Sequence, residues 1–261
     1  MRQGTIINNV RLKDDYYKVD FFAPEICASA RPGSFVHVKI AGCGDHILRR
    51  PFSICSVGES GELTVIYKVV GAGTEALSRL KSGDECDLLG PLGKPFSVPG
   101  VDEVPVLLGG GYGSAAMFML TKESKTSGVA LLGARNSKDI LLSAEYRAAG
   151  FDVRVSTDDG SEGLKGRVTD LLPGVLSDYA GRKLHFYACG PMPMLLALAR
   201  LLPELGYPES ELSLDHLMCC GVGACFACVV KIKADNEDGF RYARTCSEGP
   251  VFRADQVYLE K

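Results

Sequence analysis

The chain has 261 residues, 46% of them hydrophobic, and its 29 Lys plus Arg against 32 Asp plus Glu give a formal net charge of −3. This composition excludes a disordered chain and argues against a basic nucleic-acid-binding protein, and the length suggests two or three domains. The N-terminal segment lacks the apolar run of a secretory signal, and the longest uncharged stretches are interrupted by glycines or prolines. We therefore expect a cytoplasmic, soluble protein with no membrane span.

The first hundred residues are predicted to form an antiparallel β-barrel. Short runs rich in β-branched and aromatic residues alternate with turn residues such as Gly33 and Gly61, a pattern typical of small barrels. One short helix, 74–80, interrupts them. The predicted strands are 5–12, 16–22, 35–40, 52–57, 63–70 and 85–89.

From about residue 100 the chain alternates strands with helices, which predicts a Rossmann-like parallel α/β sheet. The predicted strands are 104–108, 129–133, 152–156 and 184–188, and the predicted helices are 114–122, 140–149, 169–176 and 192–205. The fold class is thus α+β and α/β multidomain. We predict a barrel over 1–99, a nucleotide-binding α/β domain over 100–208 and a small module over 209–261, which is too short for a core of its own.

Ten cysteines in a chain with no secretory signal point to metal or redox chemistry rather than to disulfides. Cys220-x4-Cys225-x2-Cys228, followed at a distance by Cys246, has the spacing of plant-type [2Fe–2S] ferredoxins. A four-cysteine zinc site stays open as an alternative, although zinc sites favour two Cys-x2-Cys pairs. The remaining cysteines are interpreted as bystander thiols: Cys27, Cys43, Cys55, Cys86, Cys189 and Cys219.

Two segments of the predicted barrel could bind a flavin nucleotide. Arg50 and Ser53, in an Arg-Pro-x-Ser sequence, offer a guanidinium for a pyrophosphate and a hydroxyl for a flavin nitrogen. Gly73 and Thr74 open the short helix, whose first amides could hold the same phosphates. Taken alone, a solvated arginine on an edge strand would be the simpler interpretation.

Two turns in the second domain are candidates for placing a nicotinamide nucleotide, although the first could also be a merely tight turn. The first contains Gly109, Gly110, Gly111 and Gly113, and follows a strand at the position of a dinucleotide-binding fingerprint. The second is Cys189-Gly190-Pro191, at the end of a later strand, where Cys189 is either a core residue or a neighbour of the nicotinamide ring.

No catalytic acid or base is predicted, because hydride transfer requires none. The four scattered histidines are interpreted as surface or hydrogen-bonded core residues, with His216 a candidate neighbour of the cysteine-rich loop; they are His37, His46, His185 and His216.

In combination, the three modules resemble the ferredoxin-reductase superfamily, and within it the electron-transfer subunits of class 1B dihydroorotate dehydrogenase. The resemblance covers essentially the whole chain, with Cys219 as one departure. It is carried by residues 49–54 (RRPFSI), 157–166 (TDDGSEGLKG), 220–228 (CGVGACFAC) and 244–252 (RTCSEGPVF).

The resemblance implies an NAD-linked oxidoreductase subunit that passes electrons between NAD and a partner. The partner would be an FMN-containing subunit that oxidises dihydroorotate to orotate in pyrimidine biosynthesis, in a heterotetramer of two plus two. Cys220, Cys225, Cys228 and Cys246 would ligate a [2Fe–2S] cluster. FAD would be held by Arg50, Pro51, Phe52, Ser53, Ile66, Tyr67, Lys68, Gly73 and Thr74.

Two other functions stay open at this point. The chain could be an NAD(P)H-dependent FAD/[2Fe–2S] reductase subunit serving a ferredoxin or another dehydrogenase, or a zinc-stapled binding module without redox chemistry. The choice between NADH and NADPH is also open, because Arg135 could meet a 2′-phosphate or face solvent.

Overall fold

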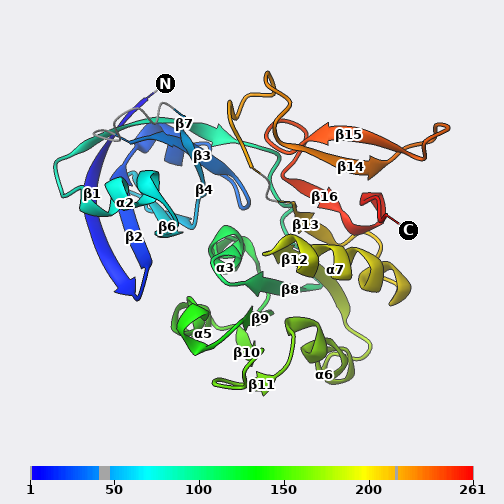
Figure 1. Cartoon of the computed structure of the whole chain (residues 1–261). Helices are drawn as coiled ribbons and strands as arrows, with labels where there is room; N and C mark the ends of the chain where they lie inside the picture. The colour runs from blue at the N-terminus through cyan, green and yellow to red at the C-terminus, as the bar shows by residue number, and fades with distance from the viewer. Residues whose placement is uncertain (1, 41–47, 215–216, 261) are drawn as a thin grey trace.

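The computed structural model describes residues 2–40, 48–214 and 217–260 (Figure 1). Its N-terminal part is an antiparallel sheet of seven strands in the order β4-β3-β7-β1-β2-β6-β5. The sheet curls so that β4, at one end, also contacts β6 near the other. The strands are β1 (Arg2–Lys13), β2 (Tyr16–Phe22), β3 (Phe35–Lys39), β4 (Arg50–Ser53), β5 (Ser56–Val57), β6 (Glu62–Lys68) and β7 (Glu85–Leu92).

Side-chain alternation explains this barrel-like sheet. Val19 and Phe21 on β2 are both fully buried and pack in one core with Val36 and Val65, as expected for strands with one face turned inward. Helix α1 (Pro24–Cys27) and helix α2 (Ala72–Arg79) connect the strands.

The prediction of a single strand over 52–57 was wrong. The chain turns a corner there, because Ile54 N–H donates to Ser34 O while Cys55 N–H donates to Thr64 O, each at 2.9 Å. It therefore leaves its pairing with β3 and takes up pairing with β6, which splits the segment into β4 and β5.

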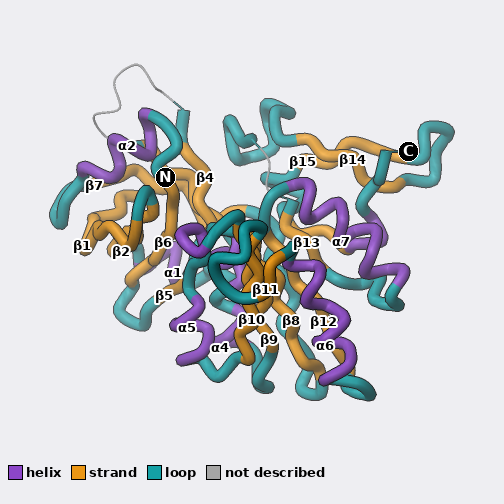
Figure 2. The backbone as a smooth tube through the Cα atoms, turned by 60° about the horizontal axis from the view of Figure 1, so that its bottom comes forward, coloured by secondary structure: helices purple, strands orange, loops and turns teal. Residues whose placement is uncertain are grey.

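The second sheet has the order β11-β10-β9-β8-β12-β13-β16, with all neighbours parallel except β16, which runs antiparallel at one edge. Figure 2 shows α4 and α5 on one side of this sheet and α6 and α7 on the other. The strands are β8 (Glu103–Gly110), β9 (Val129–Ala134), β10 (Asp152–Thr157), β11 (Leu164–Lys165), β12 (Lys183–Cys189), β13 (Glu211–Ser213) and β16 (Val251–Arg253).

The helices of this part are shorter than predicted. The segment 114–122 forms two helices instead of one, and the helix expected from 140 starts at Ser143 because Leu142, with φ 61°, has a left-handed backbone that a right-handed helix does not accommodate. The helices are α3 (Gly113–Met117), α4 (Leu120–Glu123), α5 (Ser143–Ala148), α6 (Leu172–Asp178) and α7 (Met192–Glu204), and the 3₁₀ turns are η1 (Ser137–Asp139), η2 (Val168–Leu171) and η3 (Ala254–Gln256).

The last fifty residues share a core with the second sheet. Strands β13 and β16 extend that sheet, while β14 (Val229–Lys233) and β15 (Phe240–Arg244) form a separate hairpin. Leu212, Ile232 and Phe252 pack in the same apolar core as α7 and β12. Shared packing thus supplies the core that so short a segment lacks. The domain boundaries at 99/100 and 208/209 stay predictions.

Within the described residues, no helix combines the length and apolarity needed to cross a membrane.

Candidate functional site

A cavity of about 320 Å³ lies where the barrel, the second sheet and the C-terminal segment meet. All the residues predicted to hold FAD line it except Gly73. The lining residues are Phe35, Arg50, Pro51, Phe52, Ser53, Ile66, Tyr67, Lys68, Val70, Thr74, Tyr112, Gly113, Ala115, Leu217 and Met218. Leu217 and Met218 lead directly into the cysteine loop, which we define as residues 219–228.

Gly73 does not line this cavity but contacts Arg50, which does. A Cβ at this position would come within 2.3 Å of Arg50 Nε, so the guanidinium lies against the bare backbone of the first turn of α2. Thr74 Oγ1 accepts hydrogen bonds from the N–H groups of Val70 and Gly71 at 2.9 and 3.2 Å, which orders the approach to the helix. A guanidinium beside a helix N-terminus suits a pyrophosphate, so the phosphates of FAD fit here.

Lys68 directs its charge toward the second sheet. Its Nζ lies 2.9 Å from Asp139 Oδ1 on η1, and the same oxygen accepts a hydrogen bond from Tyr16 OH at 2.7 Å. Burial and the hydrogen bond to Asp139 raise the pKa of Tyr16 to about 12, and the hydrogen bond to Asp139 also raises the pKa of Lys68. These three side chains tie the barrel to the α/β part beside the cavity.

The two turns predicted to place nicotinamide are in direct contact. They end the neighbouring parallel strands β8 and β12, whose register pairs Gly109 with Cys189. A Cβ on Gly113 would lie 2.3 Å from the carbonyl oxygen of Cys189, and one on Gly110 would lie 2.6 Å from Cδ of Pro191. Strand order reverses at β8, and open α/β sheets bind ligands outside the carboxyl ends of strands at such a point.

The side chain of Cys189 itself packs inward. It is only 1% exposed and lies in an apolar core with Leu107 and Val251. Its backbone, rather than its sulfur, faces the glycine turn.

The four predicted ligand cysteines are arranged as two pairs. The thiol of Cys220 interacts with Cys225, and that of Cys246 with Cys228. Among the described residues, no three His, Cys, Asp or Glu side chains converge on one point as the ligands of a single ion would. Cys219 also contacts Cys225.

Backbone N–H groups of the cysteine loop point at sulfur. Val222 and Ala224 donate to Cys220 Sγ at 3.5 and 3.3 Å, and Gly223 donates to Cys246 Sγ at 3.1 Å. Burial opposes ionisation of Cys220, but its hydrogen bonds with Val222, Cys225 and Ala224 outweigh burial and lower its pKa to about 6. A site that stabilises sulfur as thiolate is suited to iron.

The buried sulfur of Cys246 behaves differently from that of Cys220. Burial, and then the hydrogen bond with Cys228, raise the pKa of Cys246 to about 11. A bound metal would supply the positive charge that this pair lacks.

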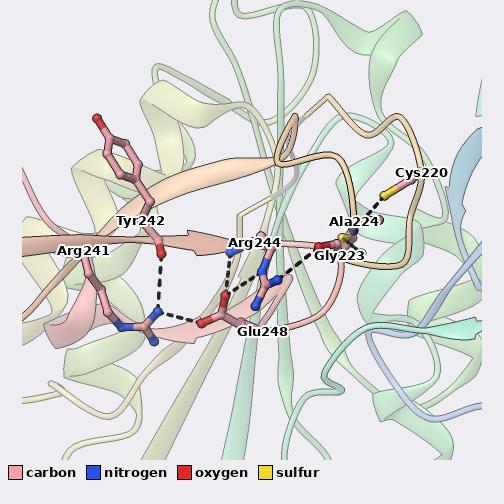
Figure 3. Close-up of polar contacts among 8 residues, drawn as sticks. Cys220, Gly223, Ala224, Arg241, Tyr242, Arg244 and Glu248 are labelled. Atoms are coloured by element: carbon pink, nitrogen blue, oxygen red, sulfur yellow. Dashed lines mark hydrogen bonds and ion pairs between the residues drawn. The ribbon is translucent and has the colours of Figure 1, made fainter.

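An arginine–glutamate brace supports the loop from β15 (Figure 3). Arg244 Nη1 donates to Gly223 O at 3.1 Å, and the guanidinium carbon lies 5.1 Å from the centre of the Phe226 ring. Glu248 Oε1 accepts from Arg244 N and Nε at 3.1 and 3.2 Å, and its Oε2 accepts from Arg241 at 2.6 Å. The hydrogen bond from Arg244 N–H, with the neighbouring guanidinium groups, lowers the pKa of Glu248 to about 2.

Sequence reasoning missed several of these residues. Arg244 and Glu248 belong to no metal-binding pattern, and Phe35 was read only as part of a strand. His37 is fully buried, yet neither ring nitrogen has a hydrogen-bond partner among the described residues, so it is not the satisfied core residue expected. Cys43, His46 and His216 lie outside the described residues.

The fold and these sites define the class: an oxidoreductase with a flavin-and-nicotinamide reductase fold joined to a cysteine-rich module. The NADH-dependent reduced ferredoxin-NADP oxidoreductase structure superposes with a TM-score of 0.83 at 29% identity, covering 99% of this chain and 90% of that one. A ferredoxin NADP+ reductase from Neisseria gonorrhoeae, with bound FAD and NADP, shares the fold at a TM-score of 0.65 and 16% identity, covering 78% of this chain and 91% of that one.

Sequence comparison is more specific. The family described as the iron-sulfur cluster binding domain of dihydroorotate dehydrogenase B matches residues 215–258. The dihydroorotate dehydrogenase B (NAD(+)) electron transfer subunit of Fusobacterium nucleatum is 36% identical over 262 residues, covering 98% of both chains, and that of Geobacillus kaustophilus is 42% identical, covering 88% of this chain and 87% of that one. The chain belongs to the family of electron transfer subunits of NAD-dependent dihydroorotate dehydrogenase B. The resemblance inferred from the sequence is confirmed, as is the fold class.

Proposed function

We propose that this chain passes electrons between NAD and an FMN-containing partner subunit that oxidises dihydroorotate to orotate, using FAD and a [2Fe–2S] cluster of its own. Two copies would assemble with two catalytic subunits. The location would be cytoplasmic, because thiolate ligands for iron need reducing surroundings.

The observation that carries this proposal is the composition of the cavity. One wall holds the Arg50–Ser53 strand of the barrel, another the Tyr112–Gly113 turn, which would place nicotinamide, and a third Met218, which leads into the cysteine loop. A flavin accepts two electrons as hydride and gives them up singly, which is the chemistry needed between nicotinamide and an iron–sulfur centre. The cavity lies between the turn proposed to place nicotinamide and the loop proposed to bind the cluster, where a flavin would connect the two.

The pairing of the cysteines supports a binuclear cluster over a single zinc ion. Zinc needs its four ligands to converge at about 2.3 Å from one centre. Here the thiol of Cys220 interacts with Cys225 and that of Cys246 with Cys228, an arrangement suited to two adjacent metal atoms with two thiolates each. The N–H groups at Cys220 and Cys246 would stabilise the added electron.

The chain's residues have definite tasks in this function. Arg50 and the first turn of α2 would hold the FAD phosphates, and Ser53 would contact the flavin. Gly110 and Gly113 keep the two turns close at the carboxyl ends of β8 and β12, where nicotinamide would bind. No side chain has to move a proton in hydride transfer, so we propose no catalytic acid or base.

The division of labour is tested by assaying the purified chain with and without its catalytic partner. We expect NADH oxidation with an artificial one-electron acceptor from the chain alone, and dihydroorotate-dependent NAD reduction only after the FMN subunit is added. Dihydroorotate turnover by the chain alone would contradict the proposal. Stable co-purification with a ferredoxin instead of an FMN subunit would favour the reductase alternative.

A further inference from the structure

Strand β3 of the barrel is in contact with both the cavity and the cysteine loop. Phe35 and His37, two residues apart on β3, point to the same face. Phe35 lines the cavity and also packs with Cys228 and Cys246. The same strand pairs with the Arg50–Ser53 strand, placing His37 opposite Pro51. Two side chains of one strand thus span the distance between the proposed flavin and cluster sites.

His37 lies directly against the cysteine loop. A Cβ on Gly221 would come within 2.8 Å of Cε1 and 2.9 Å of Nδ1 of the imidazole, so the ring edge touches the backbone next to Cys220. Gly221 also has φ 71°, a conformation that other residues rarely adopt. Backbone geometry and ring contact both require glycine here, and the result is that no side chain separates the imidazole from the loop.

The hydrogen-bonding capacity of His37 is unused among the residues that the structure describes. The side chain is fully buried, and both ring nitrogens lack a partner among the described residues. An imidazole carries at least one N–H donor whether it is neutral or protonated. Buried donors without partners are rare in folded proteins, which points to an acceptor that the described residues do not supply.

We infer that the His37 imidazole donates a hydrogen bond to a sulfur at the Cys220 end of the iron–sulfur cluster, and so acts as a positioning residue that links the flavin barrel to that cluster. This inference rests on the proposed [2Fe–2S] site. Hydrogen bonds to sulfur favour the reduced cluster and raise its reduction potential. His37 would therefore help to set the potential of the cluster from a strand that also borders the flavin cavity.

The first test uses the complete chain with its cofactors and no substitution. The protein is labelled with ¹⁵N-histidine and reduced with dithionite, and pulsed EPR then measures ¹⁵N hyperfine coupling to the cluster. We expect a histidine coupling. A cluster signal without any ¹⁵N coupling would overturn the inference, whereas the absence of a cluster signal would overturn the proposed cluster and this inference with it.

Substitutions then assign the coupling. His37→Phe keeps a ring but removes the donor, and is expected to abolish the coupling and shift the cluster potential to more negative values. His37→Gln, whose amide can donate, should recover part of the shift. His185→Phe is the matched control, because that ring lies on β12 against Tyr187, with centroids 4.6 Å apart. Retained coupling or an unshifted potential in His37→Phe would refute the assignment.

Discussion

Replacing Arg244 by Gln should increase the rate at which the chain loses its proposed cluster. The substitution removes the hydrogen bond to Gly223 O, the contact with the Phe226 ring and the ion pair with Glu248. A charged hydrogen bond contributes about 1.5–3 kcal/mol, an exposed cation–π contact about 0.5–1 kcal/mol and an exposed ion pair less than about 1 kcal/mol. Together the loss is about 2–5 kcal/mol in the free energy that keeps the loop closed.

If opening of the loop precedes loss of iron, this free energy sets the rate of loss. Since about 1.4 kcal/mol corresponds to a factor of ten, Arg244→Gln should release iron at least roughly 30-fold faster. The assay is anaerobic transfer of iron to a ferrous chelator, followed by the visible absorbance of the cluster. Arg241→Gln is the control, because Arg241 also pairs with Glu248 but, among the described residues, donates no hydrogen bond to the cysteine loop (Figure 3). Equal rates in Arg244→Gln, Arg241→Gln and the unaltered chain would refute the reasoning.

Three further predictions concern other parts of the site. Gly113→Ala places a methyl group against the Cys189 carbonyl, a steric overlap that costs about 1–3 kcal/mol. The affinity for NADH should therefore fall roughly tenfold while FAD stays bound. An unchanged Kd for NADH in a flavin-reduction titration would contradict this prediction. Burial raises the pKa of Asp139, but hydrogen bonds, led by that from Lys68, lower it overall. The charged carboxylate therefore stabilises the fold above the unfolded pKa of about 3.9, and this stabilisation is lost as the pH falls through the folded pKa. The difference in Tm between Asp139→Asn and the unaltered chain should narrow below about pH 4, and a constant difference would argue against a stabilising contact of Asp139 with Lys68 and Tyr16. Cys225→Ser should remove the cluster EPR signal and leave the FAD content unchanged, and a surviving signal would exclude Cys225 as a ligand.

The sequence pattern predicted strands whose bounds depend on their own residues, but not features that depend on pairing between distant strands. Strand 16–22 was predicted with its observed bounds because it is a short run rich in aromatic residues, and two of its residues, Val19 and Phe21, are buried on one face. The corner at Ile54 could not be predicted in this way, since it depends on whether a backbone amide pairs with β3 or β6, a choice made by the closing of the whole sheet. Strands β13 and β16 were missed for a similar reason, because three residues carry too little periodicity to reveal an added edge.

The candidate site also contains both predictable and unpredictable residues. The spacing of the cysteines and the glycine-rich turns lies within short segments, and the structure brings the two turns together as expected. His37 and Arg244 contact the cysteine loop from strands outside it, so the spacing of the cysteines does not distinguish them from other strand residues. The assignment of individual FAD, NAD and cluster residues stays a prediction until cofactors are measured.

The most direct test of the central claim is the cofactor content and EPR spectrum of anaerobically purified protein. We predict one FAD, two iron atoms and two acid-labile sulfides per chain, with one unpaired spin after reduction by dithionite. A colourless preparation that contains zinc, no labile sulfide and no paramagnetism after reduction would contradict the account.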